Sequence, residues 1–68
     1  MSLKKIMHEA AEKWKDEKTD LQIKIKELEW QKKHETDAKK LEEISEKIEK
    51  ETKRMAFCRQ RITEYENY

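Results

Sequence analysis

The apolar residues of this chain fall into two runs in which the spacing alternates between three and four residues. The first run consists of Met7, Ala11, Trp14, Leu21, Ile25 and Leu28, with Lys18 in the place that the spacing assigns between Trp14 and Leu21. The second consists of Leu41, Ile44, Ile48, Met55, Cys58, Ile62 and Tyr65, with Glu51 in the corresponding place. Such spacing lines up side chains on the side of a helix that faces another helix in a coiled coil. Together these residues are called the seam.

The two runs are out of phase with each other. If Leu28 occupies a d position, the next a positions fall at 32 and 39, whereas the second run begins at Leu41. Continuous coiled coils absorb insertions of three or four residues, and this offset of two fits neither. A turn between the halves removes the conflict. The spacing therefore predicts a single all-α domain over 1–68, an antiparallel two-helix coiled-coil hairpin. Its first helix covers about 3–33, its turn about 34–37 and its second helix about 38–66.

A fold-back centred between His34 and Glu35 would make residue i face residue 69 − i, which places Lys18 opposite Glu51. Thr36 or Asp37 is expected to cap the second helix, because a short polar side chain accepts a free backbone N–H there. The alternative is a single long helix in an antiparallel coiled-coil dimer. It shares the same pairing, and the absence of any glycine for the turn favours it.

The composition favours helices that pair with each other but bury little apolar surface. Charged residues make up 49% of the chain and hydrophobic residues 34%, and Gly and Pro are absent. A chain of 68 residues with so few apolar side chains builds only a small core by itself. Ile23, Trp30 and Phe57 lie off the seam and are candidates for a partner interface. We expect a homo-oligomer, most simply a dimer of hairpins forming a four-helix bundle, or docking on another helical protein.

The charges are balanced overall, with a net charge of +1, but unevenly placed. Residues 1–15 and 53–68, which a hairpin brings to its open end, hold eight basic and four acidic residues. Residues 16–52 hold nine basic and twelve acidic residues. A basic open end could contact nucleic acid through Lys53, Arg54, Arg59 and Arg61, but a role in solubility and partner register is favoured.

The acidic end invites a comparison with a known family. The stretch FCRQRITEYE, from Phe57 to Glu66, resembles part of the second helical arm of bacterial Gre transcript-cleavage factors. That resemblance implies a hairpin whose acidic tip enters the RNA polymerase secondary channel, with Glu35 and Asp37 as the tip carboxylates. The match covers about ten residues. The acidic motif of the Gre tip and the second Gre domain are both absent from this chain.

No pattern of catalytic, metal-binding or cofactor-binding residues is present. The absence of glycine excludes phosphate-binding loops. The stretch HEAAE at His8 has glutamate where a zinc-binding helix needs its second histidine, and Cys58 is expected to pack in the seam. One cysteine, no signal peptide and no long apolar segment predict a soluble cytoplasmic protein that does not enter a membrane.

The function predicted from the sequence is that of a non-enzymatic coiled-coil interaction or assembly module, which mediates self-association or partner docking. The alternative is a nucleic-acid-binding or transcription-regulating helical hairpin. Such a hairpin would act through its basic open end or its acidic tip.

Overall fold

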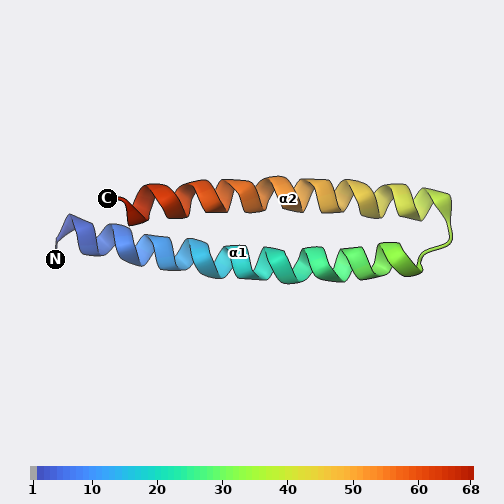
Figure 1. The fold of residues 1–68 in the computed structure, drawn as a ribbon, viewed down its shortest axis with the longest axis horizontal. Coiled ribbons are helices and arrows are strands. Elements are labelled where there is room, and N and C mark those ends of the chain that lie inside the picture. Colours follow the sequence, from blue (N-terminus) through green and yellow to red (C-terminus); the bar gives the residue numbers. More distant parts are fainter. Residues whose placement is uncertain (1) are drawn as a thin grey trace.

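The computed structural model, which describes residues 2–68, is a hairpin of two long α-helices (Figure 1). Helix α1 spans Leu3–His34 and helix α2 spans Ala38–Glu66, and the two run antiparallel and side by side. The molecule is a rod with extents of 54 × 14 × 12 Å. Both termini lie at the open end and the turn forms the tip (Figure 1). The chain is thus the all-α hairpin that the phase break predicts, and not a single continuous helix.

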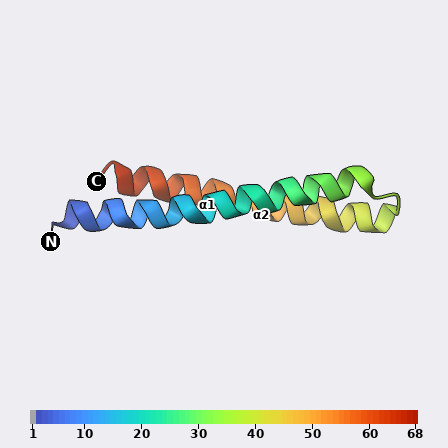
Figure 2. The same ribbon diagram turned by 90° about the horizontal axis from the view of Figure 1, so that it is seen from below.

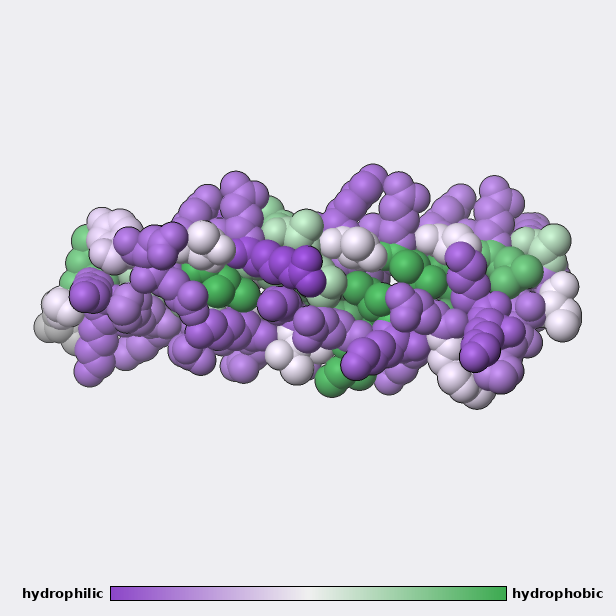
Figure 3. All heavy atoms as spheres, in the orientation of Figure 1, coloured by the Kyte–Doolittle hydropathy of each residue, from purple (hydrophilic) through white to green (hydrophobic). Residues whose placement is uncertain are grey.

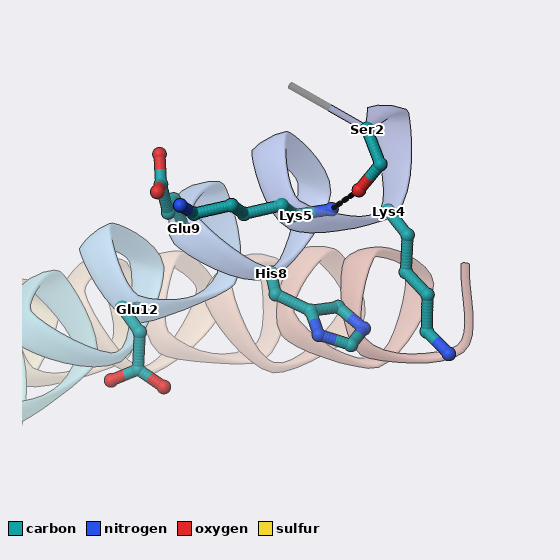
Figure 4. A pocket seen from close by; sticks show the side chains of 6 residues that line it. All are labelled: Ser2, Lys4, Lys5, His8, Glu9 and Glu12. Atoms are coloured by element: carbon teal, nitrogen blue, oxygen red, sulfur yellow. Dashed lines mark hydrogen bonds between the residues drawn. The ribbon is translucent and has the colours of Figure 1, made fainter.

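A polar side chain caps the N-terminus of each helix. Ser2 has extended backbone angles and its hydroxyl accepts the N–H of Lys5 at 3.2 Å, as Figure 4 shows. Asp37 has the same role for α2, where its carboxylate accepts the N–H of Lys39 at 2.9 Å. Each contact satisfies one of the backbone donors that the first turn of a helix leaves free. Between these caps neither helix contains a glycine or proline that would break it.

The turn reverses the chain without glycine, because it is extended rather than left-handed. Glu35 ends α1 with φ −85° and ψ 136°, and residues 2–68 contain no residue with positive φ. One oxygen of the Glu35 carboxylate accepts the N–H groups of both Thr36 and Asp37, each at 3.1 Å. These two bonds satisfy backbone donors of a turn in which no residue needs the left-handed conformation that favours glycine. His34 belongs to α1, so the connection consists of Glu35, Thr36 and Asp37.

Replacing Asp37 by alanine is expected to lower the free energy of unfolding by about 1 kcal/mol, because the cap of α2 is lost. Asp20→Ala is the matched control, since Asp20 is exposed in the middle of α1 and caps nothing. Urea unfolding followed by circular dichroism measures both. Equal stability of the two variants would show that the cap contributes nothing.

The core is one row of side chains between the helices. Its buried apolar residues, 1–9% exposed, are Ala11, Leu21, Ile25, Leu28, Cys58 and Ile62. The remaining apolar seam residues are half-buried, because two helices that cross at a shallow angle cover the row from two sides only (Figure 2). Within the seam Lys18 is half-buried and Glu51 is buried.

Contacts between the helices join residues whose numbers add up to more than the 69 of the predicted pairing. Trp14 packs against Phe57, with ring centroids 5.7 Å apart. Lys24 contacts Glu51, and Lys15 contacts Glu66. The contacts are displaced in this direction because the side chains of two antiparallel helices each lean toward the N-terminus of their own helix.

Candidate interaction surface

The predicted charge pair inside the seam does not form. The Oε1 atom of Glu51 lies 3.6 Å from Lys24 Nζ and 3.5 Å from Arg54, and within residues 2–68 no ion pair joins Glu51 to Lys18. Helical side chains lean toward the N-terminus of their own helix. In an antiparallel pair Glu51 therefore leans toward the tip and Lys24 toward the open end, so that they meet, while Lys18 leans away. Lys24 is the partner that sequence reasoning missed, and this lean is the signal that predicts it.

Glu51 is also the one buried charged side chain within residues 2–68, at 5% exposure. Its Oε2 atom has no hydrogen-bond partner among these residues. Lys24 and Arg54 are more than half exposed, so the ion pairs they make with Oε1 are partly screened by solvent. The carboxylate therefore loses much of its hydration and recovers only part of it through these contacts.

The three apolar residues proposed as a partner interface are exposed but do not form one patch. Ile23 and Trp30 are 53% and 63% exposed, and their heptad positions place them on the side of α1 that faces away from α2. Phe57, at 47% exposure, lies on α2. Its ring meets Trp14 edge-on, and the Arg61 guanidinium lies 4.9 Å above it. Phe57 thus belongs to an aromatic cluster beside the seam, and Ile23 and Trp30 form a separate surface.

A groove of about 390 Å³ adjoins the aromatic cluster, with Trp14, Leu21, Phe57 and Cys58 among its lining residues. Burial raises the pKa of the Cys58 thiol above its ordinary value, and Glu17 nearby adds to the effect. A raised pKa keeps the sulfur protonated and poorly nucleophilic. This environment is that of a packed cysteine, as the sequence predicts.

Most of the basic residues proposed to contact nucleic acid already have acidic neighbours. Lys53 lies 3.4 Å from Glu49, Arg54 lies 3.5 Å from Glu51, and Arg61 lies 3.3 Å from Glu64. Among residues 2–68, no carboxylate lies within ion-pair distance of Arg59.

The two carboxylates of the proposed acidic tip are engaged in the turn itself. Glu35 accepts two backbone N–H groups and Asp37 caps α2. Substituting these two residues would therefore change the turn as well as the charge of the tip.

The two edges of the seam differ in chemistry. Residues that directly follow a seam residue lie along one edge, which is called the seam face. On α2 this edge alternates between short side chains, Ser45, Thr52, Ala56 and Thr63, and charged ones, Glu42, Glu49, Arg59 and Glu66. Figure 3 shows apolar side chains between the two helices, among hydrophilic ones. Residues that directly precede a seam residue line the other edge, where Lys24 and Arg54 flank Glu51 and a hollow of about 460 Å³ is also bordered by Lys47 and Lys50.

Across the seam face at the open end, Lys15 bonds to Glu66 and to its own-helix neighbour Glu12. The bond to Glu66, and to a lesser extent that to Glu12, raises the pKa of Lys15 above its ordinary value. Lys15 and Glu66 both follow seam residues, which shows that the edges of the two helices meet as their heptad positions require.

Two further features concern the chemistry that this surface can support. A hollow of about 420 Å³ at the start of α1 is lined by polar residues of that helix alone, among them Lys4, His8 and Glu12 (Figure 4). Within residues 2–68 no three histidine, cysteine, aspartate or glutamate side chains come together as metal ligands would. Over the same part of the chain, neither helix combines the length and apolar character needed to cross a membrane.

Comparison with known proteins found no matching family model, curated protein or solved structure.

Proposed function

We propose that this hairpin is a non-enzymatic assembly module, which packs its half-open seam and exposed apolar side chains against other helices, in the simplest case those of a second copy. The observation that carries the proposal is the incomplete burial of the seam. Ile44, Ile48 and Met55 are half-buried although they occupy the centre of the apolar row of α2. A further helical layer would remove this surface from water. Each 100 Å² of apolar area buried in this way would stabilise the assembly by about 2.5 kcal/mol.

The exposed residues on the back of α1 extend the same argument. Trp30 is the most exposed large hydrophobic residue within the described chain, and Ile23 lies one heptad before it. Tryptophan contributes strongly to protein interfaces because its large ring buries much area at little conformational cost. Ile23 and Trp30 therefore supply a second surface on which a partner helix can pack.

Sedimentation equilibrium and thermal unfolding test this function directly. We expect a mass above that of one chain, and a Tm that rises over about a hundredfold range of concentration, because association stabilises the folded state by mass action. A single-chain mass and a constant Tm throughout this range would contradict the proposal.

The alternative role in nucleic-acid binding has less support, because Lys53, Arg54 and Arg61 each have a carboxylate within 3.5 Å that would compete with a phosphate. A binder of the phosphate backbone would show a steep loss of affinity with salt. The acidic-tip role has less support for a similar reason, since Glu35 and Asp37 are engaged in the turn.

A further inference from the structure

We infer that two copies of the hairpin associate through their seam faces in an antiparallel arrangement, with the open end of one copy beside the tip of the other. This inference rests on the proposed function and adds the identity of the partner, the face that binds it and the direction in which it lies. It is carried by the chemistry of the two edges of the seam and by the complementary charges along α2.

The centre of the seam face is the part that a second copy can cover without removing water from a charged group. Ile48 and Met55 are half-buried, and Thr52 and Ala56, which lie between and beside them in the sequence, are short and uncharged. Short residues beside an apolar row allow another helix to approach closely. On the opposite edge a partner would have to strip water from the group formed by Lys24, Glu51 and Arg54.

Charge complementarity along α2 selects the antiparallel direction. If a two-fold axis passes midway between Thr52 and Ala56, Thr52 of each copy faces Ala56 of the other. The same axis places Glu49 opposite Arg59 of the second copy, and Arg59 opposite its Glu49. Within residues 2–68 Arg59 has no acidic partner, and Glu49 is paired with Lys53 alone, at 3.4 Å and with both side chains well exposed. The proposed dimer supplies the missing partner twice.

The overall distribution of charge and the size of the face agree with this arrangement. The open end carries eight basic and four acidic residues, and the remainder carries nine basic and twelve acidic residues. Antiparallel packing therefore brings regions of opposite charge together. The rod is 54 Å long and 14 Å wide. The area given by these two lengths is comparable with the roughly 800 Å² that each partner buries in a standard interface.

A charge-swap experiment at Glu49 and Arg59 tests the inference. Arg59→Glu and Glu49→Arg each turn two attractive contacts of the dimer into repulsive ones, and each is expected to weaken dimerisation by about tenfold or more. The double variant, which carries both reversals, restores the attraction and is expected to dimerise like the unaltered chain. Lys50→Glu is the matched control, since it makes the same charge change as Arg59→Glu on the opposite edge of α2. Sedimentation equilibrium gives the dissociation constants, and circular dichroism confirms that each variant remains helical.

The outcomes separate this inference from the proposed function. If the unaltered chain associates but the single reversals leave its dissociation constant unchanged, or the double variant fails to recover, this face and direction are wrong while self-association stands. If the unaltered chain remains a monomer, both fail. Weakening by each single reversal with recovery in the double variant establishes the antiparallel seam-face dimer.

Discussion

Ile25→Asp is expected to unfold most of the hairpin at room temperature, whereas Ile23→Asp, two residues away, is expected to leave it folded. Ile25 is 9% exposed in the middle of the seam, and Ile23 is 53% exposed on the outer side of α1. Loss of a buried isoleucine removes about 2–3 kcal/mol of apolar burial. Placing a carboxylate in the same site adds the cost of stripping water from a charge. A domain of this size gains only about 3–5 kcal/mol from its core, so the total exceeds what the fold can absorb.

The pair is a sharp test because both variants make the same chemical change in the same helix. Circular dichroism at 222 nm and urea titration measure the helical content and the free energy of unfolding. For Ile23→Asp, measured at a concentration at which the chain is a monomer, the expected change in stability is within about 0.5 kcal/mol, which is typical of exposed sites. If the two variants were equally stable, the assignment of Ile25 to the core would be refuted.

Glu51→Leu is expected to stabilise the hairpin, by about 1–3 kcal/mol. Glu51 is buried among seam residues, and its Oε2 atom has no hydrogen-bond partner within residues 2–68. Leucine would fill the same part of the seam without the cost of removing water from a carboxylate. Lys24 and Arg54 lose their partner in this variant, but both are more than half exposed and remain solvated. Removing Glu51 therefore leaves no buried charge behind.

Two comparisons keep this prediction specific. Glu43→Leu makes the same change at an exposed position of α2, so it reports any general effect of leucine on the helix. Glu51→Gln keeps the shape and polarity of the side chain but removes its charge, and it is expected to have an intermediate effect. A lower midpoint of unfolding for Glu51→Leu than for the unaltered chain would show that the contacts with Lys24 and Arg54 outweigh the cost of burial.

The turn shows why some of the fold follows from local sequence and some does not. Asp37 is recognisable as a cap because its side chain type and its place before a helical run are both visible in the sequence. The role of Glu35 is not visible in this way. Its carboxylate accepts two successive backbone N–H groups in a turn without positive φ, and such a turn requires no glycine. The absence of glycine therefore argued wrongly for a continuous helix.

Some features of the candidate surface could be predicted from the sequence, and others could not. The exposure of Ile23 and Trp30 follows from their position opposite the seam, and the structure has both exposed. The cluster of Trp14, Phe57 and Arg61 could not be predicted, because it joins residues from two helices whose relative position along the axis was not known. Lys24, the partner of Glu51 on the other helix, was missed because the predicted pairing ignored the lean of helical side chains.

By itself the sequence determined which residues face the other helix, because steps of three and four residues place them on one side of an α-helix whatever lies opposite. It also determined that the chain reverses, through the change of phase between Leu28 and Leu41. Only the tertiary structure decided which seam residue meets which. Two heptad helices can shift past each other by a whole repeat without altering the composition of the seam. The end of α1 at His34 and the three residues after it select one alignment. Within that alignment, the lean of each side chain toward the N-terminus of its own helix brings Lys24 to Glu51 and takes Lys18 away from it.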